Sequence, residues 1–358
     1  MIVGLFDESN LLEVPNLAIA RCAGYHRARG DEVHHNRLGP RCDRAYVSCI
    51  FPANWRRMQV VLNQIKAGEV LVGGTGHALA AGVEPPWTKL PPEIEAAEPD
   101  FSPWPDWPWS LGFSYRGCVR NCDFCVVPRK EGQRVTRAAG CCRELLRPEA
   151  REDPQGHHLV DMANNVLAAP EQELEQLWRE VRELGITVDY CQGFDVRLIT
   201  QAIAEELAAL PLYVRWRDWG GRWQKRRRMF LALDHSGLTA QFERAARWLL
   251  KAGVAQSSIY VFVLERPDQE ADALARVRAV AALGLRPYVM PLDDYQDAGL
   301  RRWANHRYYQ FVPWEKYRWR RRGQLPLPAG VAASRVPQGQ MCAELDTTRG
   351  YDNGIISL

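Results

Sequence analysis

The feature that most constrains the fold of this chain is an alternation of short apolar runs with amphipathic segments. A short apolar run is typical of a buried strand, and apolar residues recurring about every three or four positions are typical of a helix. In the first part of the chain we expect strands at residues 2–6, 32–35, 45–50 and 70–74, and helices at 15–29 and 55–66. Strands that alternate with helices favour a parallel sheet, because each parallel connection needs a crossover. We therefore expect residues 1–95 to form a doubly wound, Rossmann-like α/β domain.

The same alternation resumes after residue 110. We expect strands at residues 110–114, 158–161, 188–197 (with its loop), 229–234, 259–264 and 286–290, and helices at 170–184, 200–210, 241–251 and 271–283. This count predicts a partial (β/α)6 barrel of TIM type over residues 111–300. Residues 96–110 are rich in proline and tryptophan, and we expect them to form a linker that packs against a domain. Residues 301–358 are then a C-terminal extension, which is basic and aromatic at first and mostly coil at its end.

The first strand of this second half leads into the stretch G-C-V-R-N-C-D-F-C at residues 117–125. Its three cysteines have the spacing C-x3-C-x2-C, and Phe124 directly precedes the last of them. Thiolates in a short loop select zinc, copper or iron–sulfur centres. A structural zinc site normally presents four ligands, whereas this loop presents three and has no companion pair at finger spacing. Three thiolates suit a four-iron cluster that keeps one iron open for an outside ligand.

This loop resembles that of the radical S-adenosylmethionine (SAM) superfamily. By that resemblance Cys118, Cys122 and Cys125 ligate a [4Fe-4S] cluster, SAM chelates the open iron, and Phe124 packs near the adenine. The resemblance implies an enzyme that cleaves SAM reductively and uses the resulting 5′-deoxyadenosyl radical to activate a substrate C–H bond. It also implies a reductant protein of the flavodoxin or ferredoxin type. The substrate stays open, and nucleic acid or a nucleotide-derived molecule is among the candidates.

Members of the superfamily commonly hold the SAM amino group with a polar, often G-G-E-like, segment after the second barrel strand. This chain lacks G-G-E, so the role passes to Asp161, Asn164 and Asn165, whose oxygens can accept hydrogen bonds from an ammonium group. The other expected SAM contacts follow later strands at the same face of the barrel: Gln192, Asp195, Arg197 and Asp234. Asp195 fits equally well as the cap of the next helix. Arg129 and Lys130, after the cysteines, are expected to be exposed basic residues.

The order of the two domains resembles a branch of the superfamily in which a cobalamin-binding-like domain precedes the barrel. The stretches P-N-L-A, G-Y-H-R-A-R-G-D-E-V and V-G-G-T-G carry this likeness. Base-off cobalamin domains ligate cobalt through the histidine of a D-x-H-x-x-G loop, which this chain lacks, since Asp31 and His34 have the wrong spacing. We therefore expect a scaffold in place of a cobalamin site. A cobalamin-dependent radical SAM methyltransferase remains an alternative.

Two segments, residues 213–228 and 301–322, interleave aromatic and basic side chains. Basic residues follow phosphates and aromatic rings stack on bases, so both segments fit nucleic-acid contacts. The competing interpretation is that the rings belong to the core and the arginines to a solvated rim. A non-catalytic iron–sulfur protein that binds nucleic acid or senses redox state is therefore an alternative from another functional class.

Composition and the N-terminal sequence indicate where in the cell the protein is expected to act. The formal net charge is only +3, so any anion-binding surface must be local. The N-terminal sequence M-I-V-G-L-F-D-E-S-N is unlike a signal peptide, and no apolar run approaches the roughly 20 residues that a membrane span needs. The ten cysteines are therefore interpreted as reduced thiols and cluster ligands. We expect a cytoplasmic protein with no membrane partner.

Overall fold

The structure is a computed structural model that describes residues 1–8, 14–85, 87, 89–218, 221–292 and 299–317. The chain divides into two compact units. The first contains residues 1–164 and 184–186, and the second contains residues 165–183 and 187–317 of the described part. Parallel sheets with helical connections place the protein in the α/β class, as the alternation predicts. Among the described residues, no helix combines the length and the apolar composition that crossing a membrane requires.

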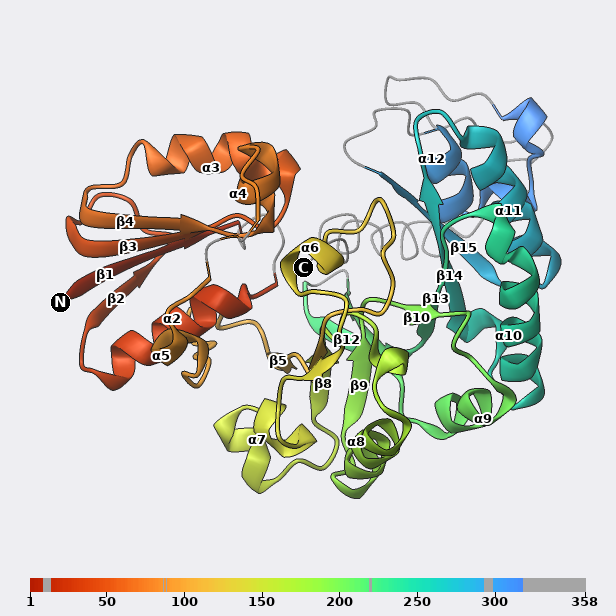
Figure 1. Cartoon of the computed structure of the whole chain (residues 1–358), viewed down its shortest axis with the longest axis horizontal. Coiled ribbons are helices and arrows are strands. Elements are labelled where there is room, and N and C mark those ends of the chain that lie inside the picture. The colour runs from red at the N-terminus through yellow and green to blue at the C-terminus, as the bar shows by residue number, and fades with distance from the viewer. Residues whose placement is uncertain (9–13, 86, 88, 219–220, 293–298, 318–358) are drawn as a thin grey trace. The chain divides into compact units, whose positions relative to one another are not determined.

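The first unit begins with a four-stranded parallel sheet of order β2-β1-β3-β4. Its strands are β1 (Ile2–Asp7), β2 (Glu32–His35), β3 (Cys42–Ser48) and β4 (Ala67–Gly73). Helices α2 (Leu17–Ala28) and α5 (Pro92–Glu95) lie on one face of the sheet, and α3 (Trp55–Leu62) and α4 (Thr75–Ala80) lie on the other (Figure 1). All four strands and both longer helices occur where the sequence predicts them. Helix α2 starts after its cap Asn16, whose Oδ1 accepts from the backbone of Ala18 and Ile19.

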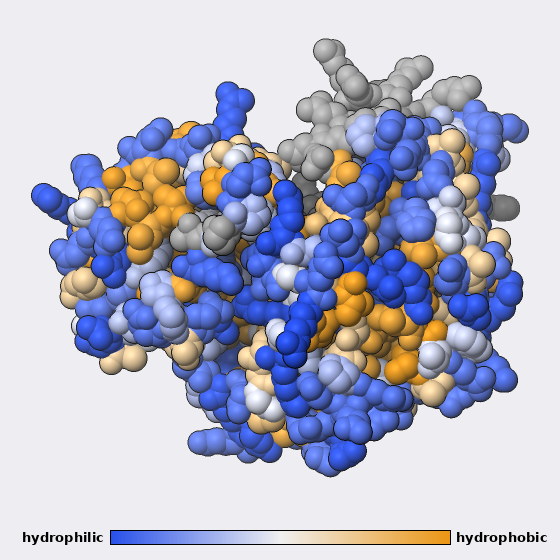
Figure 2. Space-filling view, viewed as in Figure 1, coloured by the Kyte–Doolittle hydropathy of each residue, from blue (hydrophilic) through white to orange (hydrophobic). Residues whose placement is uncertain are grey.

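Apolar residues on the inner faces of this sheet form its core. Phe6, Val47 and Met58 belong to one buried cluster between β1, β3 and α3. On the face shown in Figure 2, hydrophobic residues also gather over α3 and β4, where Val60 and Val70 are exposed. Helices thus lie on both faces of this sheet, as is usual for parallel sheets, while strand β4 at its edge stays partly exposed.

The segment after this sheet belongs to the first unit and packs against it. Trp104, Trp107 and Trp109 are all buried. The chain then forms β5 (Ser110–Gly112), which pairs in parallel with β8 (His158–Asp161). The connection between these strands contains β6 (Tyr115–Arg116), α6 (Val127–Lys130), β7 (Thr136–Arg137) and α7 (Pro148–Glu152).

The second unit is built on a parallel sheet of order β10-β13-β14-β15. Its strands are β10 (Phe194–Asp195), β13 (Met229–Leu233), β14 (Ile259–Glu265) and β15 (Arg286–Pro291). The unit also contains β9 (Thr187–Tyr190) and the helices α8 (Glu171–Glu183), α9 (Gln201–Ala209), α10 (Thr239–Lys251), α11 (Glu270–Ala282) and α12 (Gly299–Asn305). Helix α11 packs on β14 and β15, and α12 packs on β15 (Figure 1). The strands and helices expected between residues 229 and 290 are all present.

An antiparallel hairpin interrupts this alternation. Strands β11 (Tyr213–Arg217) and β12 (Trp223–Arg227) pair along their whole length. They occupy the first of the two basic and aromatic segments, for which the sequence predicted no regular structure. The last part of the second segment, residues 318–322, and the expected C-terminal coil lie outside the described residues.

Candidate functional site

The three cysteines lie in a loop, residues 117–135, whose two ends are held together by a pair of short strands. Strand β6 enters the loop and β7 leaves it, and the two pair antiparallel, with Tyr115 opposite Arg137 and Arg116 opposite Thr136. The loop starts shortly after β5, at the edge where Gly112 pairs with Asp161 of β8. The cysteines therefore follow the carboxyl ends of parallel strands, as the sequence predicts.

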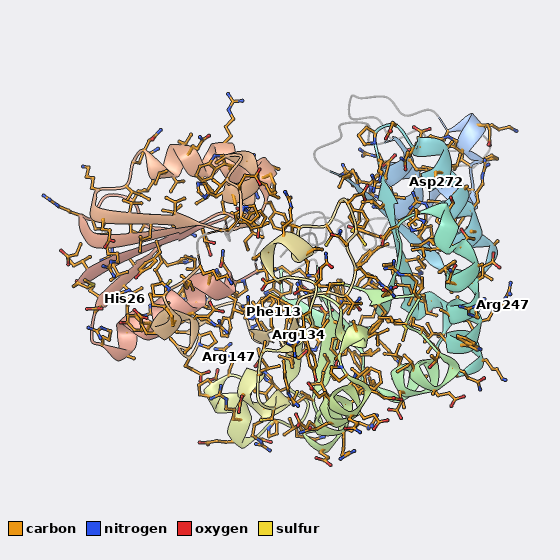
Figure 3. All side chains as sticks on the ribbon, viewed as in Figure 1. His26, Phe113, Arg134, Arg147, Arg247 and Asp272 are labelled. Carbon is orange, nitrogen blue, oxygen red and sulfur yellow. The ribbon has the colours of Figure 1, made fainter. Side chains whose placement is uncertain are left out.

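Gly117 shapes the start of this loop. Its φ of +86° lies in the left-handed region, and a Cβ at this position would be 2.1 Å from the carbonyl oxygen of Arg134 on the returning arm. Its N–H donates a 2.9 Å hydrogen bond to Oδ1 of Asn164, just after β8. Arg134 and Phe113, which precedes the loop, are labelled in Figure 3. Only glycine allows this close approach of the two arms.

All three cysteine side chains are partly exposed, and the described cysteines are present as thiols. The backbone N–H of Arg120 donates to Sγ of Cys118 at 3.4 Å, and the N–H of Cys118 donates to the carbonyl of Gly132 at 3.3 Å. The N–H of Cys125 donates to the carbonyl of Cys122 at 3.0 Å, which makes a tight turn at Phe124. These backbone hydrogen bonds fix the course of the chain around the three cysteines.

Among the described residues, no three His, Cys, Asp or Glu side chains gather as ligands of a single metal ion. The donor set of the loop fits an iron–sulfur cluster in its chemistry, because cysteine thiolates are the usual ligands of such clusters. In addition, Nδ2 of Asn164 is buried and has no hydrogen-bond partner in the described structure. A buried N–H donor beside the loop suits a sulfide or thiolate, because such hydrogen bonds tune these clusters.

Asp161, expected to contact SAM, is engaged by its own chain. It is buried, and its Oδ1 accepts from the N–H groups of Ser114 and Ala163, both at 3.0 Å. Its Oδ2 accepts from the hydroxyl of Ser114. These contacts tie the end of β8 to the residues that enter the loop, so Asp161 has a structural explanation. Its contact with SAM stays a prediction.

Charged residues support the loop from one side. Arg116 donates to Glu131 at 3.3 Å and to Glu95 at 3.1 Å. Lys130 lies 3.8 Å from Glu131 and is only partly exposed, so the prediction that it is an exposed base is wrong. Burial lowers the pKa of Lys130, and the charge of Glu131 opposes this effect. Arg129 is exposed, as expected, with its guanidinium 5.7 Å from the ring centre of Trp87.

A second group of candidate residues lies in the second unit. Asp195 is buried, and its Oδ1 accepts from Nε of Arg197 at 2.6 Å and from the backbone N–H of Arg197 at 3.1 Å. Nδ2 of Asn165 lies 3.5 Å from Oδ2 of the same carboxylate. The alternative in which Asp195 caps the next helix is wrong, because Thr200 caps α9 with its hydroxyl. Asp195 instead orients a partly exposed guanidinium.

Asp234 and Gln192 are two further candidates in the second unit. Asp234 directly follows β13, and burial raises its pKa while the positive charges of Arg197 and Arg276 oppose this effect. Gln192 is partly buried, and its side-chain amide lies 3.8 Å from Sγ of Cys191.

Arg276 of α11 is a site-supporting residue that the sequence analysis missed. Its buried guanidinium donates to the carbonyls of Leu233 and Leu264 at 2.7 Å each and to Asp272, which Figure 3 labels, at 2.8 Å. It therefore holds together the carboxyl ends of β13 and β14. The signal was present, because Arg276 falls on the apolar stripe of α11 that Ala273, Val277 and Val280 define.

The predicted site residues divide into two groups, one in each unit. The first group contains Cys118, Cys122, Phe124, Cys125, Asp161 and Asn164, and the second contains Asn165, Gln192, Asp195, Arg197 and Asp234. No protein-family model matches the chain, and comparison with curated proteins finds no relative.

Proposed function

We propose that this protein is a radical SAM enzyme that holds a [4Fe-4S] cluster with Cys118, Cys122 and Cys125. One observation carries the proposal: a C-x3-C-x2-C loop leaves the carboxyl edge of a parallel strand pair and is fixed there through Gly117 and Asn164. In barrels and in open α/β sheets, active and binding sites lie at the carboxyl ends of the parallel strands. A structural metal knuckle has no need of that position.

The finer fold assignment is part of the same proposal. We infer that residues 1–95 are a Rossmann-like, cobalamin-binding-like domain and that residues 111–300 form a partial (β/α)6 barrel. The sheet order β2-β1-β3-β4, with helices on both faces, supports the first assignment. The parallel pair β5-β8 and the parallel sheet of the second unit support the second. The N-terminal domain then acts as a scaffold.

The chain's own residues have separable tasks in this proposal. When bound, the cluster and SAM supply reductive cleavage of a sulfonium to a carbon radical, and the protein supplies binding and orientation. The three thiolates hold the iron, and the N–H donors at Cys118 Sγ and on Asn164 stabilise negative charge on sulfur. In the second unit, Arg197, oriented by Asp195, offers a guanidinium fork that can bind a carboxylate. Phe124 offers an apolar surface for the adenine.

The test is made on anaerobically purified full-length protein, reconstituted with iron and sulfide and then given dithionite and SAM. We expect a brown protein that forms 5′-deoxyadenosine. Replacing Cys122 by alanine should abolish the product and lower the iron content. The matched control is Cys141→Ala, which removes a partly exposed thiol from the same unit outside the loop and should leave both unchanged.

Three outcomes contradict parts of the proposal. A brown protein that leaves SAM intact favours the non-catalytic iron–sulfur alternative. A colourless protein that binds zinc contradicts the cluster itself. Equal iron loss in Cys122→Ala and Cys141→Ala shows that the loop is not the ligand site.

A further inference from the structure

The antiparallel hairpin of the second unit carries an unusual density of positive charge. Residues 213–228 contain seven arginines and lysines, and Asp218 is their one acidic residue. We call β11, β12, Arg222 and Arg228 the basic hairpin. Four consecutive residues of the outer strand β12 are exposed: Gln224, Lys225, Arg226 and Arg227. A chain with a net charge of only +3 therefore concentrates cations on one short ribbon.

The register places these cations on both faces of the ribbon. Directly opposite residues of an antiparallel pair point to the same face, and neighbours along a strand point to opposite faces. Lys225 opposes Arg215 and Arg227 opposes Tyr213, so Lys225 and Arg227 share one face. Arg226 opposes Val214 and lies on the other face. The exposed strand β12 thus presents positive charge on both faces of the hairpin.

Several of these cations are held in place by aromatic rings. The guanidinium of Arg226 lies 4.8 Å from the ring centre of Trp216, and that of Arg217 lies 4.7 Å from that of Trp223. A guanidinium stacked on a ring still directs its N–H donors outward from its edge, and a fixed guanidinium loses less entropy when it binds an anion. These contacts preorganise donors for phosphate.

Two of the exposed cations also donate hydrogen bonds to uncharged groups. Lys225 donates to the hydroxyl of Thr187 at 3.1 Å, and Arg227 donates to the carbonyl of Ala208 at 2.7 Å. Both acceptors are neutral. In contrast, Arg215 forms a 2.7 Å ion pair with Asp189, with exposed side-chain fractions of 6% and 0%. Arg215 therefore anchors the base of the basic hairpin, while the outer strand carries the exposed charge.

We propose that the basic hairpin binds the phosphodiester backbone of a single-stranded nucleic acid. A flexible strand can pass around the ribbon edge and reach cations on both faces. A stiff duplex or a flat anionic membrane meets only one face. This inference goes beyond the proposed function and does not depend on it, because binding can be measured without SAM or reductant.

The second basic and aromatic segment does not share this arrangement. In its described part Trp303 and Tyr317 are buried, and Trp303 packs against Trp314 with ring centres 5.4 Å apart. Trp303 and Tyr317 therefore serve packing, whereas Phe311 is 68% exposed. We assign nucleic-acid binding to the basic hairpin, because the structure describes the register and the ring contacts of its exposed cations.

The experiment measures fluorescence anisotropy of a labelled oligouridylate with the full-length protein, between about 50 and 200 mM salt. The test variant combines Lys225→Gln, Arg226→Gln and Arg227→Gln. The control combines Arg244→Gln, Arg247→Gln and Lys251→Gln on α10, which removes the same charge from exposed positions. Arg247, labelled in Figure 3, is 66% exposed.

We expect the hairpin variant to bind at least about tenfold more weakly and its log–log salt slope to fall by about 2, since each lost single-strand phosphate contact removes about 0.7. The α10 control should bind like the wild type. Equal weakening in both variants, or none in the hairpin variant, overturns the proposal. Tighter binding of a duplex, or hairpin-dependent binding to phosphatidylserine vesicles without oligouridylate binding, also overturns it.

Charged residues on an edge strand can also serve only to prevent edge-to-edge association. If the triple variant aggregates, Arg226→Gln and Lys225→Gln are measured singly in samples that remain monomeric. Each should lower the salt slope by about 0.7. An unchanged slope in both single variants overturns the proposal and leaves edge protection as the explanation.

Discussion

The backbone N–H of Gly117 donates a 2.9 Å hydrogen bond to the side-chain carbonyl of Asn164, and this bond joins the cysteine loop to the chain after β8. Gly117 is buried, so its N–H cannot turn to water when the acceptor is removed. An unsatisfied buried donor costs about 1–3 kcal/mol.

We therefore expect Asn164→Ala to lower the free energy of unfolding by about 1–3 kcal/mol and to lower the iron bound after reconstitution. Asn164→Asp keeps an oxygen acceptor and should retain most of the stability. Urea unfolding followed by circular dichroism, with an iron assay on the same samples, makes the comparison. Equal behaviour of the two variants would show that the hydrogen bond to Gly117 is not what holds the loop.

Gly117→Ala should destabilise the protein more than Gly132→Ala does. Both glycines have φ near +90°, at +86° and +90°, so alanine is strained at either position. At Gly117 a Cβ also meets the carbonyl of Arg134 at 2.1 Å, whereas at Gly132 it meets nothing within 4 Å. Strain alone costs about 1–3 kcal/mol, and the overlap adds to it. Thermal unfolding of the two variants separates the effects, and equal losses would contradict the close approach.

Arg276→Met should lower the free energy of unfolding by about 2–4 kcal/mol, because it leaves the carbonyls of Leu233 and Leu264 without their donor. The control lies on the same helix. Arg278 is 54% exposed and pairs with exposed Glu315, so Arg278→Met should cost less than about 1 kcal/mol. Denaturant titration of both variants provides the measurement. A small effect of Arg276→Met would mean that β13 and β14 keep their ends aligned without it.

His306 predicts a pH dependence. Burial and the nearby charges of Arg302 and Arg301 lower its pKa from 6.5 to about 4. Between these values the unfolded chain binds a proton that the folded protein does not, so stability falls as pH falls from 6.5 towards 4. We expect a loss of about 1–2 kcal/mol in this window after discounting for partial exposure, and a smaller loss in His306→Gln. Unfolding at a series of pH values tests this, and parallel curves for the two proteins would contradict it.

The sequence predicted the longer elements well and the loop closure poorly. The runs at residues 2–6 and 259–264 and the amphipathic pattern at 241–251 carry periodicities that packing enforces, so β1, β14 and α10 occur where expected. Strands β6 and β7 are two residues each, too short to show a period, and they pair across a 19-residue loop.

The candidate site likewise has features that the sequence predicts and features that it does not. Residue type singled out the three cysteines and Asn164 as candidates, since thiols and amides are chemically distinctive, and their roles as ligands stay predictions. Chemistry alone did not reveal that Asp161 is used by Ser114, or that Thr200, and not Asp195, caps α9. Those assignments depend on which of several equivalent oxygens reaches a given N–H, and that is decided by tertiary contacts between residues distant in sequence.

The pairing of β6 with β7 has a consequence for the order of folding and ligand binding. Bringing together the ends of a flexible loop carries an entropic cost, and in many small metal proteins the metal itself must offset that cost. Here the backbone ladder between Tyr115–Arg116 and Thr136–Arg137 closes the loop. Under the proposed function, the loop would therefore be closed before any cluster is bound, and folding would not depend on iron.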